Sequence, residues 1–346
     1  MKNESQGLGE DVMNLVRRSL LAALVIVAAA PLVAARPALA QTPAASAAKS
    51  WPQRLVKLIV PLGAGSGVDL GARLFADRLS QRWGQPVVVE NRPGGDGIVA
   101  ISGFLAAHDD NVLLCTPTSV FTAHPYLHDS LPYKQSDLLP IARLSNTIIV
   151  IAVPASMGVK SLGDLVASAR AQPGKIAWAG VTGALDFLFE GFLQQQKLSM
   201  TKVAYRNPVE AATDLSQDRV QVYSTGLPIV RPYMQAGNVK LLAVINSERA
   251  PIVGDLPTVK EAGYPELTLD GLIGVFGRPG MPNELRERIA ADVKAVAEDK
   301  TIGERLAASG QVLNVGGPAE FAAAVDAQSA KLAAIAKALG LAAAKQ

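Results

Sequence analysis

Residues 55–73 form the part of the chain whose residue types and spacing most clearly suggest chemistry. An apolar stretch runs into a turn that holds Gly63, Gly65 and Gly67, and a helical pattern follows. Glycine permits positive φ angles, so such a turn brings backbone N–H groups close to a ligand, with the positive end of the helix dipole behind them. The segment therefore predicts a binding site for an anion.

The glycine turn differs from the common phosphate-binding and catalytic motifs. No Gly-Lys-Ser/Thr follows it, and Val68 or Leu70 stands where the dinucleotide fingerprint has its third glycine. Ser66 lacks the flanking glycines of a nucleophile elbow. Asp69 is expected to cap its own helix, with ligand contact as the alternative. Glu90 ends the next predicted strand and keeps a dinucleotide-dependent oxidoreductase open as the alternative function.

Two further strand–turn–helix segments occur later in the chain. Residues 178–184 contain Thr182 and Gly183, and residues 205–208 contain Arg206, whose guanidinium group suits a carboxylate. We expect the first of these turns and the 63–67 turn to hold an anion from opposite sides. The full set of predicted ligand contacts is Leu62, Gly63, Gly65, Ser66, Gly67, Asp69, Thr116, Thr118, Thr182, Gly183, Asp186, Arg206, Asn207 and Ser224.

Catalytic chemistry finds little support in the sequence. The histidines His108, His124 and His128 are expected in or beside loops, and Pro125 is expected to prevent helical pairing of the last two, so no metal site is predicted. No nucleophile is paired with a base. We therefore expect neither an enzyme nor a cofactor. The one cysteine, Cys115, is interpreted as a small buried residue in a strand.

These motifs require an α/β framework, and the pattern of the chain supplies one. Apolar runs alternate with longer amphipathic segments, as is typical of sheets that are mainly parallel. Strands are predicted at 55–61, 86–90, 111–116, 147–153, 175–179, 202–205, 220–224, 239–246 and 271–276. Helices are predicted at 69–83, 98–107, 161–171, 185–196, 208–215, 228–235, 258–262, 282–298 and 318–338.

Segment 141–154 is too long and too apolar for one ordinary strand, and we interpret it as a crossing between two lobes. With a second crossing near 267–276, the first lobe would comprise 51–150 and 270–346, and the second, inserted lobe 151–269. The two tail helices are expected to pack on the first lobe. A cleft between hinged lobes is the architecture of a solute receptor, and one larger sheet is the alternative.

The first forty residues resemble a secretory signal peptide. Arg17 and Arg18 precede an apolar run, 19–33, and Ala38-Leu39-Ala40 offers a cleavage site. The run is shorter than the roughly 20 residues of a spanning helix, so an anchor is the weaker interpretation. Met13 is a plausible alternative start. Export to the periplasm is the expectation.

The composition of the chain limits the classes of partner that we expect it to bind. The chain has 346 residues, 49% of them apolar and 18% charged, which suffices for two ordinary domains. Removing residues 1–40 takes four basic and three acidic residues from totals of 33 and 30, which leaves 29 and 27. This balance gives no case for nucleic acid or for a membrane surface.

From Trp51 onward the chain resembles the Bug-type periplasmic receptors of tripartite tricarboxylate transporters. The resemblance rests on 58–61 with the glycine turn, on Gly84-Gln85-Pro86-Val87-Val88-Val89-Glu90-Asn91-Arg92-Pro93-Gly94, and on the later segments 242–244, 257–258 and 261–263 with Arg249. It implies a two-lobe flytrap fold, a small carboxylate ligand in the cleft between the lobes, and delivery to two integral membrane proteins. We expect a monomer. Signalling to a sensor partner is the alternative role.

The sequence departs from the family pattern in the second lobe. Phe187 stands where the family commonly has histidine, and the carboxylate of Asp186 lies beside it. Asp186 is expected either to favour a ligand with an amine or to point to solvent, and both interpretations stay open. The family also commonly has paired glycines where this chain has Gly65-Ser66.

Overall fold

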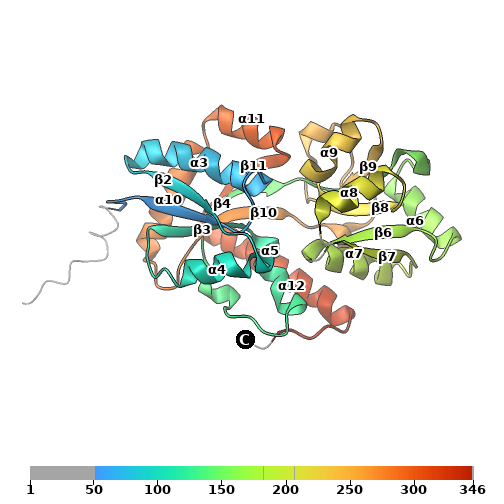
Figure 1. Cartoon of the computed structure of the whole chain (residues 1–346), viewed down its shortest axis with the longest axis horizontal. Coiled ribbons are helices and arrows are strands. Elements are labelled where there is room, and N and C mark those ends of the chain that lie inside the picture. Colours follow the sequence, from blue (N-terminus) through green and yellow to red (C-terminus); the bar gives the residue numbers. More distant parts are fainter. Residues whose placement is uncertain (1–50, 182, 206, 345–346) are drawn as a thin grey trace, which may run out of the picture. The chain divides into compact units, whose positions relative to one another are not determined.

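The computed structural model describes residues 51–181, 183–205 and 207–344. The predicted signal peptide, Thr182 and Arg206 lie outside the described residues. Within those ranges the strands form a six-stranded and a five-stranded sheet, with helices packed on both faces of each (Figure 1). The predicted α/β class is therefore confirmed.

The six-stranded sheet has the order β11-β4-β10-β3-β1-β2. β1 is parallel to β2 and β3, whereas β10 is antiparallel to β3 and β4. The strands are β1 (Val56–Val60), β2 (Val87–Asn91), β3 (Val112–Pro117), β4 (Leu139–Thr147), β10 (Gly271–Gly277) and β11 (Gln311–Gly316). One face packs on α3 (Gly67–Trp83), α10 (Asn283–Val296) and α11 (Lys300–Ala308), and the other on α4 (Ile98–Leu105), α5 (Thr118–Leu127) and α12 (Pro318–Ala338).

The five-stranded sheet has the order β7-β6-β8-β5-β9. β6 is parallel to β7 and β8, and β5 is antiparallel to β8 and β9. The strands are β5 (Ile149–Pro154), β6 (Ala177–Val181), β7 (Thr201–Tyr205), β8 (Val222–Gly226) and β9 (Val239–Val244). α6 (Leu162–Ala171) and α7 (Ala184–Gln195) pack on one face, and α8 (Pro208–Ser216) and α9 (Leu227–Gln235) on the other.

Alternation along the central strands explains why helices are needed on both faces. Val56, Leu58 and Val60 of β1 point into the core beneath α3, whereas Ile59 points into the core beneath α4. All four side chains are buried, as expected of a parallel strand covered on both sides. The carboxyl ends of β1, β2 and β3 thus meet at one edge of the sheet, where loops commonly form a binding site.

The predicted crossing at 141–154 consists of two strands from different sheets. β4 ends at Thr147, β5 begins at Ile149, and only Ile148 lies between them. The N–H of Ile148 donates to the carbonyl of Gly310, and its own carbonyl accepts from Leu227 N–H. The domain boundaries at 150/151 and 269/270 stay a prediction.

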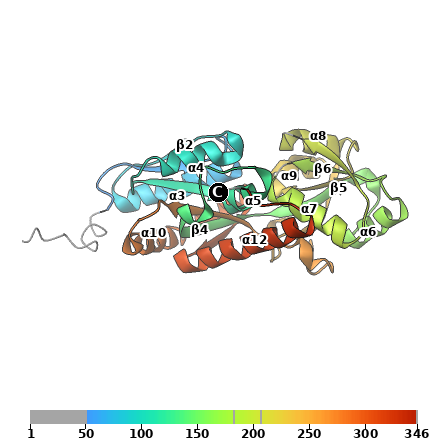
Figure 2. The same cartoon turned by 90° about the horizontal axis from the view of Figure 1, so that it is seen from below.

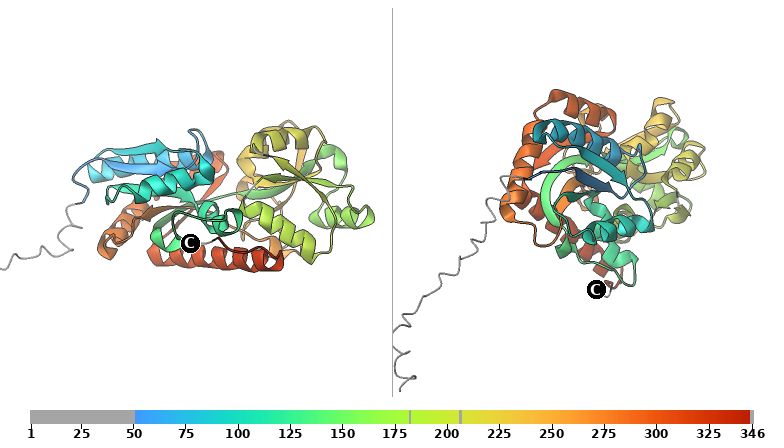
Figure 3. Two further views of the ribbon diagram at one scale, coloured as in Figure 1. Left: turned by 60° about the horizontal axis from the view of Figure 1, so that its bottom comes forward. Right: turned by 60° about the vertical axis from the view of Figure 1, so that its left-hand side comes forward.

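α12 corrects the expectation that both tail helices pack on the first lobe alone. Its first half contributes Phe321 and Val325 to the core beneath α4 and α5, whereas Leu332 belongs to the core of the five-stranded sheet. A Cβ added at Gly191 of α7 would lie 2.7 Å from Cγ2 of Ile335, so the two helices approach closely. Figures 2 and 3 show α12, in red, running along helices of both sheets.

The structure differs from the predicted elements in four places. Residues 258–262 form a turn rather than a helix: Thr258 and Glu261 exchange capping hydrogen bonds, but Gly263 adopts φ 93° and the chain leaves the helical path after one turn. α5, α11 and β11 were not predicted from the sequence. Within the described ranges, no helix has the length and apolar character needed to cross a bilayer.

Candidate functional site

The 63–67 turn joins β1 to α3, and its capping differs from the prediction. Ser66, not Asp69, is the N-cap of α3, because its hydroxyl accepts from Asp69 N–H at 3.3 Å. Asp69 lies in the first turn of the helix, and its carboxylate reaches back to accept from Gly65 N–H at 2.9 Å. The expectation that Asp69 caps its own helix was therefore wrong, and the short Ser66 hydroxyl takes that place.

The carboxylate of Asp69 is fully enclosed by donors. It is 1% exposed, and besides Gly65 N–H it accepts from Arg73 Nε at 3.0 Å and from Asn91 Nδ2 at 2.8 Å. Burial alone would raise the pKa of Asp69, but the hydrogen bonds from Arg73, Gly65 and Asn91 outweigh burial and lower it. Asp69 therefore stays ionised and holds the turn to the end of β2, so it serves the fold of the turn.

Part of the predicted anion-binding turn is occupied by the protein itself. Gly65 N–H bonds to Asp69, and Ser66 N–H donates to the Gly63 carbonyl at 3.2 Å. The N–H groups of Gly67 and Val68, in the first turn of α3, have no hydrogen-bond acceptor among the described residues. Those two N–H groups remain for an anion.

The outer part of the turn is open and the inner part is close-packed. Gly63 is exposed and has no neighbouring atom where a Cβ would lie, whereas a Cβ at Gly67 would meet Gln311 Nε2 at 3.3 Å. Gln311 Nε2 also donates to the Gly67 carbonyl at 2.5 Å. Leu62 is exposed, and its carbonyl accepts from Asn91 Nδ2.

The turn between β6 and α7 repeats the same arrangement in the five-stranded sheet. Gly183, the N-cap of α7, has φ 142° and offers no side-chain cap. The carboxylate of Asp186, in the first turn, accepts from Val181 N–H at 2.8 Å and forms an ion pair with Lys202 Nζ at 2.9 Å. Asp186 is buried and does not point to solvent, which corrects that expectation; an amine of a ligand would have to compete with Lys202 for its carboxylate, so the other expectation stays a prediction.

The charge on Asp186 is compensated less well than that on Asp69. Burial raises the pKa of Asp186, and the hydrogen bonds from Lys202 and Val181 offset only part of that effect. Lys202 is shared with Glu190, at 2.5 Å, and the two carboxylates raise the pKa of Lys202 despite its partial burial.

The other predicted contacts divide into capping residues and buried hydroxyl groups. Asn207 is the N-cap of α8 and accepts from Val209 N–H. Thr118, at the start of α5, is fully buried and donates to Gln328 Oε1 of α12 at 2.5 Å. Thr116 is buried and donates to the Pro117 carbonyl. These three side chains have partners within the protein, so a ligand would have to compete for them.

Ser224, in β8, stands apart from those residues. It is 9% exposed, and its buried Oγ has no hydrogen-bond partner among the described residues. An unpaired buried hydroxyl costs free energy unless something bonds to it. Ser224 is therefore the predicted contact that is best prepared to donate to a ligand.

A groove of about 190 Å³ lies beside the 63–67 turn, and it contains a residue that the sequence analysis missed. Arg231 of α9 lines it, is half-buried, and donates from Nη1 to the carbonyl of Ala308 at 2.6 Å. No described carboxylate pairs with this guanidinium. The groove brings Gly65 and Gly67 together with Arg231, but it does not include Gly183 or Asp186; its lining is Gly65, Gly67, Leu70, Pro228, Arg231, Pro232, Gln235, Ala308 and Ser309.

The residue that motivated the oxidoreductase alternative is already paired. Glu90 forms ion pairs with Lys57 Nζ at 2.9 Å and Arg92 Nε at 2.5 Å, and the hydrogen bonds from these two groups lower the pKa of Glu90. Its carboxylate would have to leave both cations to bind a ribose. Cys115 is buried in β3, as predicted, and burial raises the pKa of its thiol to about 12.

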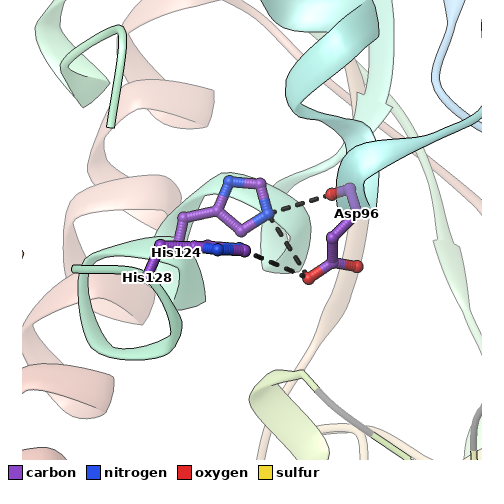
Figure 4. Close-up of side chains that lie close together, drawn as sticks. All are labelled: Asp96, His124 and His128. Carbon is purple, nitrogen blue, oxygen red and sulfur yellow. Dashed lines mark hydrogen bonds and ion pairs between the residues drawn. The ribbon is translucent and has the colours of Figure 1, made fainter. Parts of the chain in front are cut away.

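The two histidines that were expected to stay apart come together. Pro125 lies inside α5, so the helix continues through it and carries His124, with His128 directly after it. Their ring centroids are 5.0 Å apart, and both rings face the carboxylate of Asp96 (Figure 4).

Known proteins are similar to this chain in sequence and in fold. Residues 71–341 match the family described as the tripartite tricarboxylate transporter family receptor. A UPF0065 protein of Bordetella bronchiseptica is 30% identical over 263 residues, which cover 75% of this chain and 78% of that protein. Protein BugT of Bordetella pertussis is 28% identical over 272 residues, covering 77% and 83%.

A solved structure resembles most of the described part. The protein Rpa4515 of R. palustris, determined with adipate, superimposes with a TM-score of 0.74 at 28% identity and covers 84% of this chain and 99% of that one.

Proposed function

We propose, given that this chain belongs to the tripartite tricarboxylate transporter receptor family, that it is a non-enzymatic periplasmic receptor for a small carboxylate. The observation that carries the proposal is the groove beside the 63–67 turn, in which the open first turn of α3 lies next to Arg231. The adipate-bound relative supports the ligand class. Delivery to the two membrane subunits of a tripartite transporter is proposed from the family relationship.

The ligand carboxylate would replace contacts that the protein now leaves incomplete. It would accept from Gly67 and Val68 N–H, at the positive end of the α3 dipole, and from the guanidinium of Arg231. Ser224 does not line this groove; its Oγ is proposed to donate to a second polar group of the ligand because it has no partner among the described residues. Asp69 and Asp186 would act indirectly, because each fixes the turn in which the N–H groups lie.

The experiment is a calorimetric titration of the purified protein with adipate and with other mono-, di- and tricarboxylates. A dissociation constant near the micromolar range corresponds to about −8 kcal/mol and suits reversible capture. Arg231→Gln should weaken binding at least tenfold, because a hydrogen bond to a charged group contributes about 1.5–3 kcal/mol. Arg170→Gln, which removes an exposed arginine of α6, is the matched control.

Absence of a calorimetric signal with every carboxylate would contradict the ligand class. Equal affinity in the Arg231→Gln and wild-type proteins would contradict the position of the site. Carboxylate uptake by cells that carry the membrane subunits, measured with and without this receptor, separates transport from a sensory role.

A further inference from the structure

Asp96, His124 and His128 form a compact cluster that the receptor function does not use. Asp96 belongs to the short 3₁₀ turn Gly95–Gly97 between β2 and α4, whereas the histidines lie at the end of α5. Asp96 Oδ2 is 3.6 Å from His124 Nε2 and 3.9 Å from His128 Nε2. Figure 4 shows both rings turned toward this carboxylate. One ligand atom from each residue lies within 4.8 Å of the other two.

The hydrogen bonds of the cluster are incomplete. His124 is fully buried and both of its ring nitrogens are partnered: Nε2 donates to the Asp96 carbonyl at 2.9 Å, and Nδ1 bonds to the Tyr133 hydroxyl. His128 has a ring that is about one-third exposed, yet its Nε2 is buried and has no hydrogen-bond partner among the described residues. A buried ring nitrogen without a partner, aimed at a carboxylate and a second imidazole, points to a ligand at their centre.

We propose that Asp96, His124 and His128 bind a divalent transition metal ion of the zinc type. Two imidazole nitrogens and one carboxylate oxygen are a ligand set that Zn²⁺ accepts, with the fourth position of the tetrahedron open to water. Bonds of about 2.0–2.1 Å place tetrahedral ligand atoms roughly 3.4 Å apart. The two separations from Asp96 Oδ2, 3.6 and 3.9 Å, therefore need to shorten by a few tenths of an ångström, and the imidazole nitrogens lie within 4.8 Å of each other.

The donor atoms also determine which metals are expected. Imidazole suits Zn²⁺, Co²⁺, Ni²⁺ and Cu²⁺, whereas Mg²⁺ and Ca²⁺ require six or more oxygen ligands. Only one carboxylate belongs to this cluster. The site should thus discriminate strongly against the two alkaline-earth ions.

Tyr133 would act as a positioning residue for His124. To bind a metal, Nε2 of His124 would have to release the Asp96 carbonyl to which it now donates, and the ring proton would move to Nδ1, where the Tyr133 hydroxyl can accept that N–H. A ligating histidine is usually fixed in this way through its second nitrogen. Tyr133→Phe should therefore weaken metal affinity by about 10–100-fold without removing a ligand.

The test is calorimetric titration of the tag-free, chelator-treated protein with ZnCl₂. The expected result is one Zn²⁺ per chain, with no measurable binding of Mg²⁺. His128→Gln and Asp96→Asn should each lower the affinity at least tenfold. His108→Gln is the matched control, because it removes an exposed histidine outside the cluster.

Cobalt gives an independent measurement. Four-coordinate Co²⁺ absorbs visible light strongly, so Co²⁺ added to the wild type should give a spectrum that is lost in His128→Gln and retained in His108→Gln. Circular dichroism of each variant establishes that it is folded. Absence of Zn²⁺ binding by the folded wild type, or equal Zn²⁺ affinity in the wild type and both ligand variants, would overturn the proposal.

Discussion

The two glycine turns, one in each sheet, share a design and differ in how their charges are compensated. In both, a carboxylate in the first turn of a helix reaches back to a turn N–H: Asp69 to Gly65, and Asp186 to Val181. Asp69 is held by a cation and two further donors, and its pKa is lowered. Asp186 shares its cation with another carboxylate, and its pKa is raised.

This difference shows that geometry alone does not decide what a buried carboxylate contributes. Both carboxylates accept from a turn N–H, but ionisation of Asp69 stabilises its turn, whereas ionisation of Asp186 destabilises its turn. The charge of Asp69 therefore stabilises the 63–67 turn, whereas the charge of Asp186 is only partly compensated in the β6–α7 turn.

The largest expected effect is the loss of the Asp69 carboxylate. Asp69→Ala should lower the free energy of unfolding by about 3 kcal/mol, because Gly65 N–H, Asn91 and Arg73 lose a buried acceptor. Asp164→Ala is the matched control: its carboxylate accepts from Lys160 N–H in the same local motif but is exposed, so a clearly smaller loss is expected. Urea unfolding measures both, and equal losses would contradict the role of burial.

Next in size are the glycines that make each turn possible. Gly183 has φ 142° and Gly65 has φ 83°, conformations that cost a residue with a Cβ free energy. Gly183→Ala should destabilise the protein by about 2 kcal/mol and Gly65→Ala by about 1 kcal/mol. Gly63→Ala, where φ is not positive and no atom lies nearby, should change stability by less than about 0.5 kcal/mol. Thermal or urea unfolding of the three variants shows which of the two turns loses more stability when its glycine is replaced.

The pH dependence of the two carboxylates should have opposite signs. For Asp69 the folded pKa lies below the ordinary 3.8, so its stabilisation is present above that value and is lost as pH falls through the folded pKa. For Asp186 the folded pKa lies above 3.8, so stability falls as pH rises from 3.8 through the folded pKa.

Urea unfolding from about pH 2.5 to about pH 7 measures this difference. Relative to Asp69→Asn the wild type should gain stability with rising pH, and relative to Asp186→Asn it should lose stability. Differences of the same sign would show that the two turns are electrostatically alike.

The smallest effect on stability is expected at Ser224. Its hydroxyl has no partner among the described residues, so Ser224→Ala should change the free energy of unfolding by less than about 0.5 kcal/mol. Ser145 is also buried, but its hydroxyl donates to Gln311 Oε1, so Ser145→Ala should lower the free energy of unfolding by about 1 kcal/mol or more. Ser224→Ala should nevertheless weaken carboxylate binding by about tenfold, or about 1.4 kcal/mol. The prediction for Ser224 would be refuted if urea unfolding showed that Ser224→Ala lowers stability and calorimetry showed that its carboxylate affinity is unchanged.

Much of the local structure could be predicted from the sequence, because local patterns determine it. The apolar run before Gly63 and the glycines after it specified β1 and the turn, and the alanine-rich tail specified α10 and α12. α5 was missed because Pro125 normally ends a helix, yet here it stands in the last turn. β11 was missed because its apolar pattern is short and its partner, β4, is distant in sequence.

The candidate site was less predictable, because its decisive contacts are long-range. Lys202 lies on β7, so its pairing with Asp186 depends on how β6 and β7 align. Arg231 reaches the groove only because α9 lies beside the end of α11, a relation with no local signal. The His124–Asp96 pairing likewise joins helix α5 to the Gly95–Gly97 turn, which are separate in sequence.

The helix α12 determines how the protein should melt. Two independently folded halves would give two heat-absorption peaks in scanning calorimetry. Because Phe321 and Leu332 of one continuous helix belong to cores on different sheets, unfolding either core removes support from the other. A single peak, with calorimetric and van't Hoff enthalpies that agree, is the thermal signature of this shared helix.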